Sequence, residues 1–417
     1  MRAWRALYTA ALLLALGGLY FLQFFWPKLK LWWRARATSP PLMPIDRPVL
    51  WMHCASVGEF EQGRPVLEYL IQKFPHRPYV VVTFFSPSGW KRYQQSYPFA
   101  DWIGPAPTDL PWIVRRWIEA IHPTAVFYVK YDLWPNLVSE LARVGCPQYL
   151  LAAHVTPLQG LRWWWRKKLL RYMDHLFVQT AADQTRLSTE GFTQVTLAGD
   201  SRVLRVRELA ENWLPVSGMA EWLGNHFCIV AGSVWEADVR FLAQAYAHLR
   251  GQQTRWIVVP HEVSPKQVET LRRLWPVPTS LYTEPEWNPS RDTLFVDTTG
   301  LLAYLYAYAH VAWIGGGFGK GIHNILEAVA YGKPVFFGPK YHEFPEAEEL
   351  IKLKVAESCQ YAVGFSNAVK SFVKNKHRLQ IISEKARSYL DSKPHTPKIV
   401  ADVLKEKSWM KALYQSM

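Results

Sequence analysis

A carboxylate on a turn between two regular elements is the first candidate for chemistry in this sequence. Glu59 lies in HCASVGEFEQGRPV (53–66), where an apolar strand, PVLWMHC (48–54), passes through Ser-Val-Gly into a helix. A Glu in a first helical turn can simply interact with the helix dipole. Strand-to-helix turns are also where α/β proteins place working groups, so Glu59 could equally be a catalytic group.

A glycine-dense stretch, WIGGGFGKGIHNILEAVAYGKPVFFGP (313–339), is the second candidate. We expect a strand to enter the loop and a helix to begin near Ile322, which would offer free N–H groups to a phosphate. Lys320 adds a positive charge. Asn324 and Glu327 would share one face of that helix, from which Glu327 could accept hydrogen bonds from ribose hydroxyls. The spacing matches neither a Walker A motif nor a dinucleotide fingerprint, and tight turns with an exposed Glu are the structural alternative.

Polar residues follow other predicted strands as well. In the second half they include Ser233 in GSVWEAD and His261 in PHE, and in the first half they lie in FFSPSG, PAPTD and VKYDLWPN. Each could instead cap a helix or lie at the surface. Arg202, in GDSRVLR, lies near the junction of the two halves and could contact an anion or form a structural ion pair. Carboxyl ends of parallel strands meet at one edge, so together these residues predict a ligand site.

The elements that must position these residues form two α/β series. We expect strands at 48–54, 79–85, 125–129, 148–153, 175–179 and 194–200, and then at 227–232, 255–260, 293–297, 311–317 and 334–339. Their apolar runs are continuous rather than alternating, which is typical of parallel sheets covered on both faces. Helices, such as those expected at 64–74 and 109–121, separate them. Two doubly wound sheets that form a cleft are the predicted architecture.

Composition narrows the classes of partner. The 417 residues exceed one ordinary core, and 48 Lys+Arg against 34 Asp+Glu give a formal charge of +14, which favours anionic partners. No nucleic-acid-binding motif accompanies the charge, so nucleic acid is not the expected partner. The cysteines are far apart and predict buried free thiols in a reducing compartment, with no structural zinc site. They are Cys54, Cys146, Cys228 and Cys359.

The N-terminus contains a candidate membrane anchor. Residues 6–26, ALYTAALLLALGGLYFLQFFW, are 21 positions without a charge, about one membrane span. A basic aromatic flank, PKLKLWWRAR (27–36), follows in place of a small-residue cleavage site, which favours an uncleaved anchor over a signal peptide. The flank carries more positive charge than Arg2 and Arg5, so the body is expected to be cytoplasmic. A helix that lies in the membrane interface is the alternative.

Taken in order, the motifs resemble those of the 3-deoxy-D-manno-octulosonic acid (Kdo) transferases of lipopolysaccharide biosynthesis, and most closely the Bacteroidetes-like versions. They are HCASVGEFEQGRP, TFFSPSG, PTD, KYDLWPN, GDSRV, AGSVWEAD, PHE, DTTG and GGGFGKGIHNILEAVAYGKPVFFGP, and they span residues 53–339. The anchor precedes them, as it does in that family.

The resemblance implies a GT-B glycosyltransferase, an α/β protein with two Rossmann-like domains facing a cleft behind an N-terminal membrane-anchor helix. We expect the anchor and its flank in 1–36, an acceptor domain in 37–207, a linker in 208–222 and a CMP-Kdo-binding domain in 223–417, whose last helix could pack back on the first domain. The implied reaction is inverting transfer of Kdo from CMP-Kdo to the lipid A precursor lipid IVA, without cofactor or metal. The implied place is the cytoplasmic face of the inner membrane, whose anionic lipids suit a basic protein.

The resemblance also assigns residues. Glu59 matches the family's catalytic base, which would deprotonate the attacking sugar hydroxyl. The implied donor-site residues are Ser233, Pro260, His261, Gly316, Gly317, Lys320, Asn324, Glu327 and Arg202. Those expected in the acceptor site or cleft are Ser56, Gly58, Ser86, Asp109, Lys130 and Asp132. Lys130 and Asp132 stand where many family members carry two acidic residues, and Leu204 stands where an Asp is frequent.

Two other functions fit the same features. One is a membrane-associated GT-B transferase that uses a UDP- or GDP-sugar. The other is a membrane-anchored nucleotide-binding protein without catalysis, against which the intact Glu59 motif argues.

Overall fold

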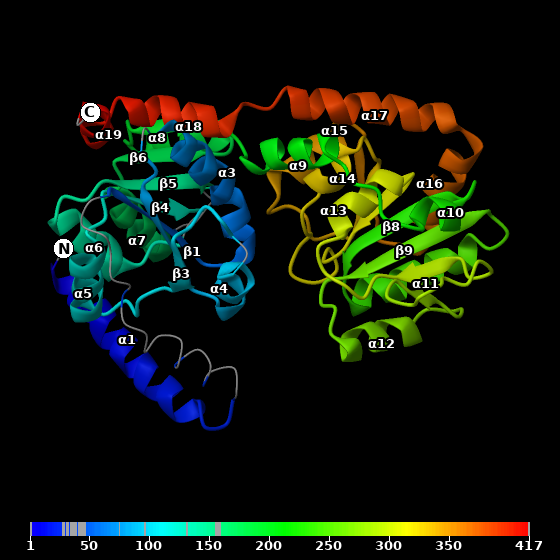
Figure 1. Cartoon of the computed structure of the whole chain (residues 1–417), viewed down its shortest axis with the longest axis horizontal. Coiled ribbons are helices and arrows are strands. Elements are labelled where there is room, and N and C mark those ends of the chain that lie inside the picture. Colours follow the sequence, from blue (N-terminus) through cyan, green and yellow to red (C-terminus); the bar gives the residue numbers. More distant parts are fainter. Residues whose placement is uncertain are drawn as a thin grey trace. The chain divides into compact units, whose positions relative to one another are not determined.

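The chain folds into two compact α/β units in a computed structural model that describes residues 2–26, 30, 33, 40, 47–74, 76–95, 97–130, 132–154 and 160–415 (Figure 1). The first unit consists of residues 1–202 and 394–417, and the second of residues 203–393. Each unit contains one sheet of seven strands. The strand pairings within both sheets are parallel, which confirms the predicted fold class.

The first sheet has the strand order β3-β2-β1-β4-β5-β6-β7. Its strands are β1 (Val49–Cys54), β2 (Tyr79–Phe84), β3 (Trp102–Pro105), β4 (Ala125–Val129), β5 (Gln148–Ala153), β6 (His175–Val178) and β7 (Val195–Leu197). The helices of this unit are α1 (Arg2–Leu22), α3 (Val57–Lys73), α4 (Pro87–Tyr93), α5 (Pro111–Ile121), α6 (Pro135–Arg143), α7 (Gly160–Leu170), α8 (Ala181–Thr189), α18 (Thr396–Lys405) and α19 (Ser408–Gln415). The strand order reverses direction between β1 and β4, and such switch points are where doubly wound sheets bind ligands.

Both faces of this sheet are covered, as the continuous apolar runs predict. Every residue of β1 is buried. Leu50, Met52 and Cys54 join one core cluster, whereas Val49 and Trp51 join another. This alternation between two cores explains why a strand buried on both faces needs apolar residues at consecutive positions.

The second sheet has the strand order β10-β11-β9-β8-β12-β13-β14. Its strands are β8 (Phe227–Val234), β9 (Thr254–Pro260), β10 (Ser280–Leu281), β11 (Thr293–Phe295), β12 (Val311–Ile314), β13 (Val335–Phe337) and β14 (Ala356–Ser358). Around it lie α9 (Arg202–Glu211), α10 (Met219–Leu223), α11 (Glu236–His248), α12 (Pro265–Arg273), α13 (Leu302–Leu305), η1 (Tyr306–Tyr308), α14 (Leu326–Ala330), α15 (Pro345–Lys352), α16 (Ala362–Lys374) and α17 (Lys376–Asp391). The switch point of this sheet lies between β8 and β12.

The C-terminal segment returns to the first unit. Helix α18 packs against α3, and Val400, Ala401 and Leu404 are buried in the core cluster that also holds Leu50. The hydroxyl of Thr396 donates to the carbonyl of Ala198 at 2.6 Å. The last helices therefore complete the first unit.

Several local expectations differ from the structure. The short edge strands β3, β10 and β14 were not expected, because two or three residues, or a segment such as WIGP with Gly and Pro, give no apolar run. The stretch 208–222 contains the end of α9 and most of α10, and its Met219 and Trp222 are buried. All four cysteines are buried and free, as expected.

Helix α1 covers most of the apolar N-terminal stretch. Its residues Trp4–Leu22 are long and apolar enough to cross a membrane, on length and composition alone. Most of the basic flank 27–36 lies outside the described residues.

Candidate active site

Glu59 lies at the start of α3, directly beyond the carboxyl end of β1. Its Oε2 atom accepts hydrogen bonds from the backbone N–H groups of Ala55 and Ser56, at 2.5 and 3.1 Å. Ser56 is the N-cap and Glu59 the third helical residue, so the carboxylate closes the turn as in a capping box. With only 8% exposure, however, Glu59 is far more buried than a capping residue needs to be.

The surroundings of Glu59 raise the pKa of its carboxyl. Burial is the largest cause and the charge of Asp132 the next, whereas the two backbone hydrogen bonds and Lys130 act in the opposite direction. A raised pKa makes an ionised carboxylate a stronger base. Phe60 itself points into the core, where its ring packs against Phe84 at 5.3 Å between centroids.

Asp132 is held near Glu59 by a histidine that the sequence did not single out. The Nε2 atom of His53 lies 2.9 Å from Oδ2 of Asp132, and its Nδ1 lies 2.9 Å from Oγ1 of Thr83. His53 is fully buried on β1. The sequence did contain a signal for His53, because a polar residue in the otherwise apolar strand PVLWMHC needs hydrogen-bonding partners once it is buried. This contact connects the loop after β4 to the end of β1, across the switch point.

Lys130 and Arg202 lie close to a second carboxylate, Asp200. The Nε and Nη2 atoms of Arg202 lie 3.0 and 2.5 Å from Oδ2 of Asp200. Burial would raise the pKa of Asp200, but Arg202 outweighs it, with a smaller contribution from Lys130, and the pKa is lowered. Lys130 has a left-handed backbone, with φ of 61°. The sequence left a ligand anion and a structural ion pair open for Arg202, and the structure shows an ion pair with Asp200 within the first unit.

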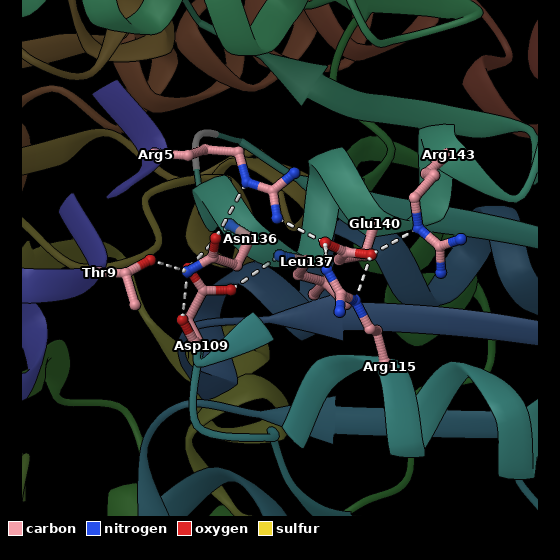
Figure 2. Close-up of polar contacts among 8 residues, drawn as sticks. All are labelled: Arg5, Thr9, Asp109, Arg115, Asn136, Leu137, Glu140 and Arg143. Atoms are coloured by element: carbon pink, nitrogen blue, oxygen red, sulfur yellow. Dashed lines mark hydrogen bonds and ion pairs between the residues drawn. The ribbon is translucent and has the colours of Figure 1, made fainter. Parts of the chain in front are cut away.

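The other residues expected in the acceptor site or cleft have different surroundings. Asp109 is buried, and its two oxygens accept from the N–H groups of Leu137 and Asn136, at 2.8 and 3.0 Å (Figure 2). Its carboxylate therefore caps the start of α6. Ser86 is the N-cap of α4, and its N–H donates to the carbonyl of Ala55 at 2.9 Å, which links the two turns. Gly58 is exposed, next to Glu59.

In the second unit, three aromatic rings stack at the switch point. Trp235 follows β8, His261 follows β9 and His323 lies beyond the glycine loop. The ring of His261 stacks on His323 at 4.2 Å and lies 4.6 Å from Trp235. The indole Nε1 of Trp235 donates to Nε2 of His323 at 3.0 Å. Burial, followed by the neighbouring His261, lowers the pKa of His323 to about 4, and burial also lowers the pKa of His261, so both imidazoles of the stack are uncharged near neutral pH.

Asp238 connects this stack to the glycine loop. Its Oδ2 atom accepts from the N–H groups of Trp235 and Gly316, both at 2.9 Å, and its Oδ1 accepts from Nε1 of Trp313 at 3.3 Å. The side chain is buried. The sequence had pointed to GSVWEAD through Ser233 alone, which has a left-handed φ of 54° at the end of β8. Trp235 and Asp238 were missed because an aromatic residue and a first-turn acid are common at any helix start.

The glycine loop differs from its prediction. Helix α14 begins at Leu326 rather than near Ile322, and it is only five residues long. Asn324 therefore precedes the helix, where its Oδ1 accepts from the N–H of Leu326 at 3.2 Å and its Nδ2 donates to Oε1 of Glu327 at 3.0 Å. The two side chains are hydrogen-bonded, but the predicted shared helix face is wrong because Asn324 precedes α14. The chain needs further residues to close the loop before α14 can start.

The glycines of the loop serve close backbone packing. A Cβ on Gly317 would lie 2.6 Å from the backbone nitrogen of Gly338, and the N–H of Gly316 is held by Asp238. Lys320 is exposed, and Pro260 is buried as the last residue of β9. The loop backbone is thus packed closely against neighbouring backbone, and at Gly316 it lies beside the ring of His323.

Each unit therefore gathers predicted residues at its own switch point. The first gathers Glu59, Lys130 and Asp132, and the second gathers His261, Gly316, Asn324 and Glu327. Among the residues that the structure describes, no group of three or more His, Cys, Asp or Glu side chains is placed to hold a metal ion.

Comparison with known proteins shows which family this chain resembles. The model of the family described as 3-Deoxy-D-manno-octulosonic-acid transferase (kdotransferase) matches residues 31–205. A 3-deoxy-D-manno-octulosonic acid transferase of Aquifex aeolicus (strain VF5) is 27% identical over 309 residues, which cover 73% of this chain and 79% of that protein. The predicted resemblance to the Kdo transferases is confirmed. With it, the predicted class of enzyme, a glycosyltransferase, is confirmed as well.

The similarity extends over nearly the whole chain. The transferase of the same name from Chlamydia muridarum (strain MoPn / Nigg) is 25% identical over 404 residues, 93% of each chain. Among solved structures, the UDP-GlcNAc 2-epimerase from Neisseria meningitidis shares the fold, with a TM-score of 0.60 at 12% identity over 86% of this chain and all of that one. The predicted GT-B fold class is confirmed.

Proposed function

We propose that this protein is an inverting glycosyltransferase that moves Kdo from CMP-Kdo to the lipid A precursor lipid IVA at the cytoplasmic face of the inner membrane. The observation that carries the proposal is the buried carboxylate of Glu59 at the first switch point, in a turn that lies within the stretch matched by the Kdo transferase family. The names of the relatives give Kdo as the transferred group, and we assign CMP-Kdo as the donor and the lipid acceptor on that basis.

The first unit supplies the base. Glu59 accepts the proton of the attacking acceptor hydroxyl as that oxygen bonds to the anomeric carbon of Kdo, while the bond from this carbon to the CMP phosphate breaks. The helix N-terminus keeps the carboxylate ionised. Burial and Asp132 keep it basic. The charge of Lys130 partly opposes this rise in the pKa of Glu59 and so favours its ionised form.

The second unit offers a site suited to a nucleotide. The uncharged stack of Trp235, His261 and His323 presents aromatic surface for a base or sugar, and the Asn324–Glu327 pair presents an acceptor for ribose hydroxyls. The exposed Lys320 is free to approach the phosphate or the Kdo carboxylate, and we assign it that role.

The decisive experiment uses the purified full chain with CMP-Kdo and lipid IVA, with mass spectrometry of the lipid product. We expect the lipid mass to increase by whole Kdo residues and CMP to be released. In a parallel thermal-shift assay, CMP should raise the melting temperature, whereas UDP and GDP should not. Stabilisation by UDP or GDP with no Kdo product would instead support a transferase of different donor, and CMP binding without any product would support a non-catalytic protein.

Replacing Asp132 with Asn should move the acid limb of the pH–rate profile to lower pH. The negative charge of Asp132 raises the pKa of Glu59, so its removal lowers that pKa and leaves the base ionised at more acidic pH. We expect the rate at neutral pH to fall by less than tenfold, since the base becomes weaker but remains in place. The measurement is kcat/KM for Kdo transfer across pH in wild type and variant.

Asp101→Asn is a suitable control, because Asp101 binds the backbone N–H of Val80 on the same sheet and is not among the groups that act on the pKa of Glu59. An unshifted acid limb in Asp132→Asn would show that Glu59 is not the group that titrates.

A further inference from the structure

The N-terminal end of α1 is not a lipid-facing surface, because polar contacts fasten it to the first unit. The guanidinium of Arg5 donates to Oδ1 of Asn136 at 3.2 Å and to Oε1 of Glu140 at 2.5 Å (Figure 2). The hydroxyl of Thr9, one turn further along α1, accepts from Nδ2 of Asn136 at 3.1 Å. Trp4 is buried, with its ring edge-on to Trp165 of α7 at 4.5 Å. We call these contacts of Trp4, Arg5 and Thr9 the α1 clamp.

The α1 clamp contacts buried polar residues of α6. Glu140 is completely buried and is also bound by Arg115 at 2.9 Å and Arg143 at 2.7 Å. Burial raises the pKa of its carboxyl, but the arginines outweigh this and lower it to about 2, so it stays ionised. Asn136 is completely buried as well, and its Nδ2 also donates to the carbonyl of Asp109 at 2.6 Å. Without the clamp, Glu140 and Asn136 would each lose a hydrogen-bonding partner. Buried polar atoms left without partners lower the stability of the fold.

The sequence after α1 cannot bring the chain back across a bilayer. A helix of 21 residues is about 30 Å long, so a crossing α1 would place its last residues on the far side from its clamped end. The chain would then have to return to β1 through residues 23–48. This segment contains Lys28, Lys30, Arg34, Arg36, Asp46 and Arg47, and each charge opposes entry into hydrocarbon.

The remainder of α1 is nevertheless suited to lipid. Its exposed apolar side chains include Leu14 at 79% and Phe21 at 70% exposure, and it contains no acidic residue. Neighbouring α7 presents an exposed Trp164, with Nζ of Lys168 3.3 Å from the centre of its ring. Tryptophan and basic side chains together favour the headgroup region of an anionic membrane.

We infer that α1 does not cross the membrane but enters a single leaflet from the side on which the catalytic units lie, with its first residues clamped to α6 on that same side. The occupant of its exposed apolar surface is thus the lipid of one leaflet. The inference rests on the membrane association proposed above and is independent of the reaction.

Protease protection of tagged full-length protein tests the topology. One epitope tag is placed at the N-terminus or at the C-terminus, and each protein is probed in spheroplasts and in inverted membrane vesicles after fractionation. We expect the protein in the membrane fraction and both tags accessible from the same face. Tags on opposite faces would overturn the inference, whereas a protein absent from the membrane fraction would overturn the proposed location itself.

The clamp and the lipid occupant need separate tests. Arg5→Ala should speed hydrogen exchange of the α1 amides near residues 4–9 by at least tenfold, whereas Arg116→Ala, which removes an exposed charge on α5, should not. Equal exchange in both variants would show that the clamp does not form.

A photo-crosslinking residue at position 14 should give lipid adducts in native membranes, and chain-to-chain adducts instead would assign the surface to a second copy.

Discussion

Glu59→Gln should lower kcat/KM for Kdo transfer by about 10²- to 10⁴-fold while leaving the fold and donor binding intact. The amide oxygen of Gln can still accept the two backbone hydrogen bonds that Oε2 of Glu59 now accepts from Ala55 and Ser56. Glutamine serves as well as glutamate in a capping box. Only the ability to take a proton is lost, so the variant separates the two roles that the sequence could not tell apart.

The matched control for this variant is Glu61→Gln. Glu61 lies two positions further along α3, accepts from the hydroxyl of Tyr93 and forms an ion pair with Arg64 at 3.6 Å. Both substitutions remove one negative charge near the same helix N-terminus, so their effects through the dipole are similar. We expect Glu61→Gln to stay within about threefold of wild type. Initial rates and isothermal titration with CMP would be measured for all three proteins, and more than a tenth of wild-type activity in Glu59→Gln would exclude Glu59 as the base.

Asp238→Ala should have the largest effect on stability and should act on the second unit. It removes one carboxylate from three donors, the N–H groups of Trp235 and Gly316 and the indole of Trp313, all in a buried setting. Hydrogen bonds to charged groups are worth more than neutral ones, and buried donors left without partners are costly. We expect the free energy of unfolding of this unit to fall by about 3 kcal/mol. CMP affinity should fall at least tenfold, because Trp235 and the glycine loop lose their common anchor.

Hydrogen exchange resolved by segment is the suitable measurement, since the two units do not unfold as one two-state system. Amides of β8 and β12 should exchange faster in Asp238→Ala, whereas those of β1 and β4 should not change. Glu236→Ala is the control, because Glu236 lies in the same first turn of α11 but is exposed and pairs with the exposed Arg240 at 2.6 Å. Its effect should stay within about 0.5 kcal/mol. Equal effects of the two variants would show that Asp238 has no special role.

The sequence was most informative where a strand is buried on both faces. The runs around β1, β4 and β8 predicted parallel sheets, and the residues just beyond such strands are where Glu59, Asp132 and the glycine loop lie. This success has a physical reason. A strand buried on both faces needs consecutive apolar residues, and the end of that apolar run marks the carboxyl end of the strand, where parallel sheets bind ligands.

Contacts between distant segments could not be predicted in the same way. His53 meets Asp132 and Asp238 meets Gly316 only after the sheets have formed, and no local pattern marks such pairs. The early start predicted for α14 failed because helix periodicity continued through residues that the structure uses to close the glycine loop. Asp109 was expected in the acceptor site or cleft, and no local pattern showed that its carboxylate would bind the backbone N–H groups at the start of α6.

The return of residues 394–417 to the first unit affects the order in which the two units can be completed during translation. The first unit needs Val400, Ala401 and Leu404 for its core, so it must wait until the ribosome has synthesised the final segment. The second unit is contiguous in sequence and can fold as soon as residue 393 has left the exit tunnel. The unit that bears Glu59 and α1 therefore begins first and is completed after the second unit, so α1 leaves the ribosome well before its own unit can close.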